Sequence, residues 1–196
     1  MYTVYGKVMT RAFRVLWMLE EIGQPYDLVP VGPQSDEVNA LNASGKVPVL
    51  KVDDAAITDS TAILTFLADK HQALTFPAGT LERARQDALT HLVLDEIDAV
   101  LWTGARHSFI LPEERRVPGV KDSLKWEFER NLTRLSERLD GPFLMGETMT
   151  IADIILTHCL NWAFSAKFPV ENAVMKDYGK RMRGREAFKR VVALSE

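Results

Sequence analysis

The chain has 196 residues, of which 46% are hydrophobic and 26% charged, a composition typical of a globular protein with an adequate core. Its formal net charge of −3 argues against nucleic acid or an anionic membrane as the main partner. The single cysteine, Cys159, excludes an intramolecular disulfide framework and a Cys-x-x-Cys redox pair, which favours the cytoplasm. No run approaches the ~20 apolar residues of a membrane span, and the four histidines lack metal-ligand spacing, so neither membrane insertion nor a metal site is expected.

The first part of the chain alternates strand and helix patterns. Apolar residues recur at helical spacing after Thr10, which is expected to cap that helix, and Gly23 is expected to end it. The predicted elements are a strand at 2–5, a helix at 10–22, a strand at 26–31, a weakly helical piece at 35–41, a hairpin of strands at 49–52 and 55–58, and a helix at 60–71. The order β-α-β-α-β-β-α, with the first two strands parallel, is that of a thioredoxin-like domain.

Strand patterns end after the segment Phe76-Pro77-Ala78-Gly79, the best candidate for a linker. Helices are predicted at 80–107, 121–139, 150–166, 171–182 and 184–194. We therefore expect a thioredoxin-like domain at 1–75, a linker at 76–80 and an all-helical domain at 81–196. Asp95, Glu96 and Asp98 on the long first helix are expected to lie on a solvated or interface face, and Cys159 is expected to be inert core packing.

A capping box marks the third helix of this second part. Thr150 precedes Asp153 by three residues, with an acidic side chain in place of the usual Glu, and Met149 and Ile154 are placed to form a hydrophobic staple around the box.

The first domain carries two short motifs, the stretch 45–50 and the stretch 59–63, which begins nine residues after Leu50. Pro48 stands at the mouth of a strand, and a cis Val47-Pro48 bond would turn the backbone N–H and C=O of Val47 outward, toward an extended partner. Asp59 or Ser60 caps the helix that follows the hairpin, and the free N–H groups of a helix start can hold a carboxylate.

Together these motifs resemble the glutathione site of the glutathione transferase family, and the resemblance spans nearly the whole chain, weakest after residue 170. It implies a thioredoxin-like α+β N-terminal domain followed by an all-α helical domain. It also implies that Val47, beside a cis Pro48, pairs with the cysteinyl unit of glutathione. Asp59 and Ser60 would hold the γ-glutamyl end, and Lys46 could reach the glycine carboxylate.

The chemistry implied by the resemblance belongs to the thiol of glutathione, whose pKa is near that of free cysteine, about 8.5. A hydroxyl and a helix N-terminus can lower such a pKa. The segment from Thr10 to Trp17 resembles the first helix of serine-type family members, with Thr10 in place of the activating serine. Tyr5 is the alternative, because tyrosine-type members carry their hydroxyl at the end of the first strand.

Three residues are candidates for the second-substrate pocket. Trp102 and Arg106 share a helix face, and Phe109 follows where that helix ends. A tryptophan and an arginine could bind a flat, hydrophobic electrophile and its developing negative charge; a core role for Trp102 and a solvated Arg106 are the alternative.

The sequence thus predicts a cytoplasmic glutathione transferase, with glutathione as co-substrate, no metal, and a homodimer implied by the resemblance. Because threonine replaces serine at position 10, a non-catalytic glutathione-binding or partner-binding protein stays open as an alternative. So does another glutathione-dependent enzyme, such as an isomerase, a dehalogenase or a peroxidase.

Overall fold

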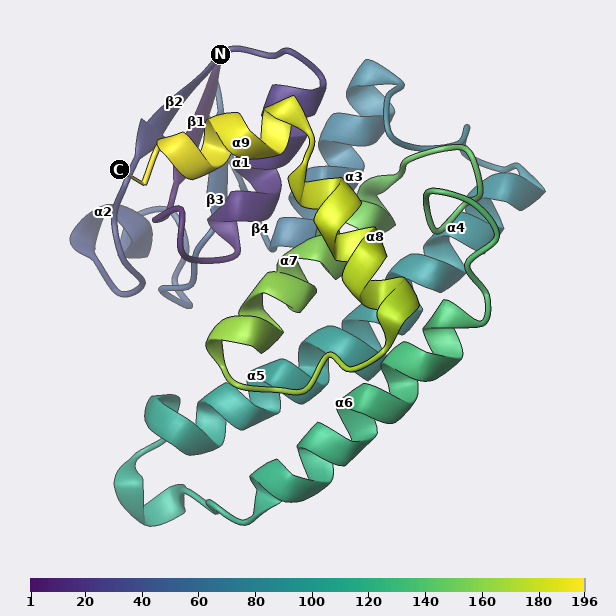
Figure 1. Cartoon of the computed structure of the whole chain (residues 1–196). Helices are drawn as coiled ribbons and strands as arrows, with labels where there is room; N and C mark the ends of the chain where they lie inside the picture. Colours follow the sequence, from purple (N-terminus) through teal and green to yellow (C-terminus); the bar gives the residue numbers. More distant parts are fainter. Residues whose placement is uncertain (196) are drawn as a thin grey trace. The chain divides into compact units, whose positions relative to one another are not determined.

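The fold is described from a computed structural model, which describes residues 1–195 of the chain (Figure 1). Its elements in chain order are β1 (Tyr2–Tyr5), α1 (Ala12–Glu21), β2 (Tyr26–Val29), α2 (Asp36–Asn39), β3 (Val49–Val52), β4 (Ala55–Thr58), α3 (Ser60–His71), α4 (Leu81–Leu92), the π-helix η1 (Val93–Asp98), α5 (Ala99–Ala105), the π-helix η2 (Arg106–Ile110), the 3-10 helix η3 (Glu113–Arg115), α6 (Val120–Ser136), α7 (Ile151–Ser165), α8 (Ala173–Arg183) and α9 (Glu186–Ala193).

The chain divides into two compact units. The first comprises Met1–Ala78 together with the chain from Arg183 onward, and the second comprises Gly79–Met182. The predicted boundary near residue 80 coincides with the first division. The last helix differs from the expectation, because α9 was placed with the helical domain but packs on α1 of the first unit.

A four-stranded mixed sheet forms the centre of the first unit, in the order β2-β1-β3-β4. β1 runs parallel to β2 and antiparallel to β3, and β3 and β4 form the antiparallel hairpin. α1 packs against β1 and α3, and α3 packs against β4. The thioredoxin-like topology predicted for this part of the chain is therefore confirmed.

Helix α1 is buried along most of its length, since every residue from Ala12 to Leu19 is shielded from solvent. The chain leaves the helix at Gly23, which has φ of +65° and is followed by a Gln24 N–H that donates to the Leu19 carbonyl. This is the glycine-terminated helix end that the sequence predicted.

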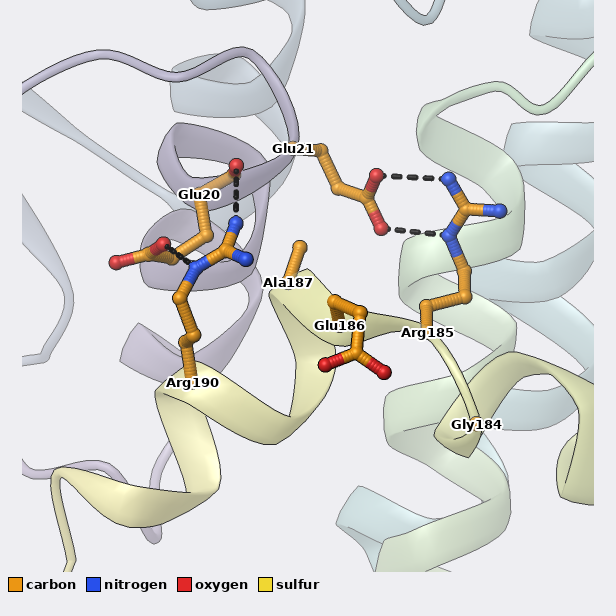
Figure 2. Close-up of a pocket in the computed structure, with 7 residues that line it drawn as sticks. All are labelled: Glu20, Glu21, Gly184, Arg185, Glu186, Ala187 and Arg190. Carbon is orange, nitrogen blue, oxygen red and sulfur yellow. Dashed lines mark hydrogen bonds and ion pairs between the residues drawn. The ribbon is translucent and has the colours of Figure 1, made fainter.

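Helix α9 lies against α1 (Figure 1) and is held there by an aromatic cluster and by two ion pairs, which Figure 2 shows; we call this set of contacts the α1–α9 latch. Arg185 donates to both carboxylate oxygens of Glu21, at 2.6 and 2.8 Å, and Arg190 pairs with Glu20. The ring of Phe188 lies 5.0 Å from the ring centroid of Trp17, edge-on. These contacts make α9 part of the first unit.

The second unit is all-helical and is built around α7. The buried core includes Ile97, Leu101, Phe128, Leu132, Ile155 and Cys159. The helix predicted at 80–107 is not a single regular helix, because two π-helical segments interrupt it. Asp98 at the end of η1 is buried rather than on a solvated face, whereas Asp95 is exposed and Glu96 is half-buried. Cys159 is fully buried and therefore lies in the core, as predicted. Its thiol donates to Asp98 Oδ2 at 3.7 Å.

The capping box at the start of α7 is confirmed. The backbone N–H of Thr150 donates to Asp153 Oδ2 at 2.8 Å. Asp153 also reaches outside the box, because its Oδ1 accepts from the Leu144 N–H at 2.8 Å and from the Tyr178 hydroxyl at 2.9 Å. One buried carboxylate thus joins the preceding loop, α7 and α8.

Candidate functional site

Three strand ends meet at one edge of the sheet in the first unit. The registers place Tyr5 of β1 opposite Val49 of β3, and Val49 opposite Thr58 of β4. The residues just beyond these ends are Gly6, Val47-Pro48 and Asp59-Ser60. The hydrogen-bond ladder therefore brings the two predicted motifs together at a single edge.

Gly6 forms the corner of this edge. Its φ is +145°, and a Cβ at this position would come within 2.6 Å of the Ala12 Cβ, 3.4 Å of the Val47 Cβ and 3.6 Å of Thr10 Oγ1. The absence of a side chain at Gly6 thus lets Ala12 of α1 approach this backbone closely, and Thr10 and Val47 lie at ordinary contact distance from the same corner. A side chain here would both clash and require an unfavourable backbone conformation.

The Val47-Pro48 peptide bond is cis. Pro48 is buried and Val47 is half-buried, directly before β3. Lys46 is exposed, and its carbonyl accepts a hydrogen bond from Asn42 Nδ2 at 2.9 Å. The cis Val47-Pro48 bond that would turn the Val47 backbone outward is therefore present, and Lys46 is exposed next to it.

Thr10 precedes α1 by two residues and is not its N-cap, a position that Arg11 takes without a side-chain bond. The Thr10 N–H donates to the Lys7 carbonyl in the turn that precedes the helix. The Thr10 hydroxyl donates to the same carbonyl at 2.7 Å and accepts from the Ala12 N–H at 3.2 Å.

Asp59 caps α3, with Oδ1 accepting from the N–H groups of Thr61 at 2.8 Å and Ala62 at 3.1 Å. Its side chain is exposed and its φ is +71°, in a region that residues other than glycine seldom occupy. Such outliers concentrate at binding sites, so this backbone favours a functional role for the position.

Ser60 is 3% exposed and follows at the first position of α3. Its Oγ accepts a hydrogen bond from Nη1 of Arg14 at 3.2 Å, and Arg14 itself is 1% exposed. A buried guanidinium thus connects α1 with the start of α3 and places positive charge beneath the serine. Arg14 was not predicted as a site residue, because a charged residue in an amphipathic helix is normally assigned to the solvent face.

Tyr5, the alternative hydroxyl, is half-buried at the end of β1. Strand alternation puts it on the face opposite Tyr2 and Val4, which are buried. Tyr5 and Thr10 both border the Gly6 corner, so the structure leaves both as candidates.

The three predicted electrophile-binding residues belong to the second unit. Trp102 is half-buried on α5, and Phe109 in η2 is 65% exposed. Arg106 is half-buried, and its Nη2 donates to Thr103 Oγ1 at 3.1 Å.

Other groupings carry less chemistry. A hollow of about 420 Å³ lies at the α1–α9 latch, but four of its charged side chains are paired in Figure 2, Glu20 with Arg190 and Glu21 with Arg185, and its Glu186 pairs with Lys189. Among residues 1–195, no group of three or more His, Cys, Asp or Glu side chains gathers as a metal site. None of the helices in this range is long and apolar enough to cross a membrane.

The chain has a thioredoxin-like domain with a cis-proline at the edge where its strand ends meet, followed by an all-helical domain. This combination places it in the class of two-domain thioredoxin-like proteins. Comparison with known proteins then gives the family. The model of the glutathione S-transferase N-terminal domain matches residues 8–70, which include Thr10, Val47-Pro48 and Asp59-Ser60 but neither Tyr5 nor Gly6. The chain belongs to the glutathione transferase family.

Individual relatives agree with this assignment. The chain is 28% identical to glutathione S-transferase GstA of Escherichia coli O157:H7 over 163 aligned residues, and the alignment covers 78% of each chain. It is 32% identical to human glutathione S-transferase theta-2 over 143 residues, which are 66% of this chain and 55% of that one. A maleylacetoacetate isomerase of Rhizobium meliloti is 28% identical over 155 residues, 74% of this chain and 73% of the relative.

Solved structures share the fold over its full length. A glutathione transferase from Methylococcus capsulatus superposes with a TM-score of 0.86 at 24% identity, which covers 100% of this chain and 98% of the other.

Proposed function

We propose that this protein is a glutathione transferase that activates the thiol of glutathione with the hydroxyl of Thr10. The observation that supports the proposal is that Thr10 and Val47 lie beside the bare backbone of Gly6, at the sheet edge where β4 ends just before Ser60. These groups supply a hydroxyl, an outward backbone beside a cis-proline, and a helix start with a buried cation beneath it.

Glutathione would lie along this edge as an extended partner. The N–H and C=O of Val47 pair with its cysteinyl unit. The N–H and hydroxyl of Ser60 bind the γ-glutamyl carboxylate, and the Arg14 charge beneath Ser60 favours that anion. The exposed carboxylate of Asp59 pairs with the γ-glutamyl ammonium, and Lys46 with the glycine carboxylate.

Thr10 has one hydroxyl proton, which is directed at the Lys7 carbonyl. To stabilise a thiolate, the hydroxyl has to turn that proton to the glutathione sulfur while it keeps the bond from the Ala12 N–H. The added methyl group of threonine restricts this rotation compared with serine. The thiolate then forms a bond to an electrophilic carbon, and the leaving group departs with its electron pair; a peroxide oxygen is an alternative acceptor.

The test is an ultraviolet titration of the glutathione–protein complex from about pH 5 to 10, which follows thiolate absorbance. Wild type is expected to lower the thiol pKa by about one unit or more. Thr10→Ala is expected to lose the shift, Thr10→Ser to keep it, and Tyr5→Phe to leave it unchanged. If Tyr5→Phe removes the shift and Thr10→Ala does not, the hydroxyl is that of Tyr5.

Two outcomes would change the function itself. Binding of glutathione with no pKa shift would make the protein a glutathione carrier or partner-binding protein. A shift without transfer to an aromatic halide would direct attention to the isomerase, dehalogenase or peroxidase alternatives. The roles of Trp102, Arg106 and Phe109 toward the electrophile, the homodimer and the cytoplasmic location stay predictions; sedimentation that gives a monomer at micromolar concentration would remove the dimer.

A further inference from the structure

The sulfur atoms of this chain differ sharply in their access to solvent. Seven are methionine thioethers and one is the thiol of Cys159. Met9 is 91% exposed and Met1 is 79% exposed, whereas Cys159 is fully buried. The other methionines are buried or half-buried: Met18, Met145, Met149, Met175 and Met182. An oxidant dissolved in water therefore meets the thioethers of Met9 and Met1 before any other sulfur of the chain.

Met9 lies in the turn that leads from β1 to α1. The Thr10 N–H and the Thr10 hydroxyl both donate to the Lys7 carbonyl, at 2.9 and 2.7 Å, and they close this turn over Val8 and Met9. The backbone of Met9 is held by these bonds, while its side chain extends into solvent. The thioether therefore belongs to the residue directly before Thr10, whose hydroxyl we propose as the activating group.

Met1 has a similar exposure but a different location. It precedes the start of β1, whereas Thr10 follows the end of that strand, and its ammonium pairs with the Asp53 carboxylate at 3.4 Å. Asp53 follows β3, at the opposite end of that strand from Val47-Pro48. The two exposed thioethers thus belong to opposite ends of the sheet, and only Met9 is next to the proposed glutathione site.

We propose that Met9 is an oxidation site through which hydroperoxides regulate the glutathione site. The thioether sulfur attacks one oxygen of the peroxide, and an S–O bond forms as the O–O bond breaks. The proton of the peroxide moves to the other oxygen, which leaves as an alcohol, or as water from hydrogen peroxide. The sulfur is oxidised by two electrons and the peroxide is reduced by two. The product is methionine sulfoxide, in which a polar group replaces an apolar one.

The effect of the sulfoxide depends on the role of the Thr10 hydroxyl, so this part of the inference rests on the proposed function. The proton of that hydroxyl has to turn from the Lys7 carbonyl to the glutathione sulfur. A sulfoxide oxygen on the neighbouring residue carries a partial negative charge and accepts hydrogen bonds. It competes for the proton and disfavours a thiolate nearby. Oxidation of Met9 is therefore expected to raise the pKa of the bound thiol and to slow the transfer.

The first measurement maps oxidation by mass spectrometry after brief treatment of the full chain with hydrogen peroxide. Trypsin cleaves after Lys7 and Arg11, so Met9 is the only methionine in its peptide. This peptide is expected to gain one oxygen at least about tenfold faster than the peptides that carry Met18 and Met175, because those thioethers are buried. Equal rates in the three peptides would overturn the assignment of Met9 as the site.

The second measurement repeats the ultraviolet titration of bound glutathione with oxidised protein from which the peroxide has been removed. Oxidised wild type is expected to show a thiol pKa at least about half a unit above that of untreated wild type. Met9→Leu has no thioether at this position and is expected to keep its thiol pKa after the same treatment. Met145→Leu, the control at a half-buried methionine of the second unit, is expected to respond to peroxide as wild type does.

Methionine sulfoxide reductases remove the added oxygen, so incubation of the oxidised protein with them is expected to restore the untreated pKa. An unchanged thiol pKa in protein that is fully oxidised at Met9 would overturn the regulatory role. An equal rise in Met9→Leu would also overturn it, because the sensitive group would then lie elsewhere. Untreated wild type without a lowered thiol pKa would overturn the proposed function instead, and the peptide map would still decide whether Met9 is the oxidation site.

Discussion

In the first unit, several side chains use the same atoms for a structural hydrogen bond and for the chemical role that we propose. The Thr10 hydroxyl supports the turn before α1, Asp59 caps α3, and Ser60 is bonded to the buried Arg14. The Thr10 hydroxyl has to turn its proton away from the Lys7 carbonyl before it can stabilise a thiolate, whereas the bonds of Asp59 and Ser60 already hold their side chains at the sheet edge before any ligand arrives. Such preorganisation lowers the entropy cost of binding.

Asp153 is the residue whose loss we expect to be most costly. In Asp153→Asn, one of the two side-chain positions becomes an N–H₂ group facing the N–H of Leu144 or Thr150, and buried donors lose their partner. The free energy of unfolding by urea is expected to fall by about 3 kcal/mol. Asp177→Asn, at an exposed position of α8, is the matched control and is expected to be neutral.

Tyr26 gives a prediction for alkaline pH. Burial, together with the hydrogen bond to Glu20, raises the pKa of its phenol well above the ordinary value of about 10. Above pH 10 the unfolded chain therefore loses the proton while the folded chain keeps it, so stability declines as pH rises. Tyr26→Phe is expected to flatten this decline in urea unfolding between about pH 9 and 11; a decline as steep as in wild type would show that Tyr26 does not cause it.

Among the elements, α9 shows most clearly how distant segments are joined. The carboxylate of Glu21 is shared by Arg185 and the indole N–H of Trp17, which donates to Oε1 at 2.8 Å. The Glu21 side chain is only 9% exposed, whereas the Glu186–Lys189 pair on α9 is exposed on both sides. The two pairs differ in solvent screening, which decides how much each contributes.

Glu21→Gln should test this difference. The amide cannot accept two guanidinium bonds and leaves the partly buried Arg185 without its charge partner. We expect a loss of about 1 to 2 kcal/mol in the free energy of unfolding. Glu186→Gln removes the same charge from the exposed pair and should leave the unfolding midpoint unchanged, and an equal loss in both variants would contradict the burial argument.

For the whole molecule, the division into units predicts the effect of shortening the chain. Truncation after Met182 removes α9 and with it Phe188, whose ring packs on Phe13 and Trp17 at 5.0 Å each. We expect the first unit to lose at least about 3 kcal/mol of stability, because an aromatic core residue is removed. Hydrogen exchange should show lost protection in α1 and β1 and unchanged protection in α6 and α7. Lost protection in α6 instead would restore the sequence-based assignment of residues 183–196 to the helical domain.

The local pattern predicted most of the elements. The hairpin, the parallel first pair of strands and the capping box at Thr150 were predicted, because alternation, turn residues and caps act over a few neighbours. The π-helical segments were not, since an extra residue in a turn leaves no mark in an apolar periodicity of this length. The candidate groups at the sheet edge were likewise named in advance, but their meeting around Gly6 depends on strand register.

The sequence by itself determined the class of the fold and the residue types available for the proposed glutathione chemistry. Both could be predicted because they depend on short motifs, whose geometry is set by residues close together in the chain. Only the tertiary structure decided that Arg14 lies buried under Ser60, that Asp98 is in the core and that α9 belongs to the first unit. Each of these depends on packing between segments far apart in the chain. The free energy of burying a charge is set by the partners that surround it, and a one-dimensional pattern contains no record of those partners.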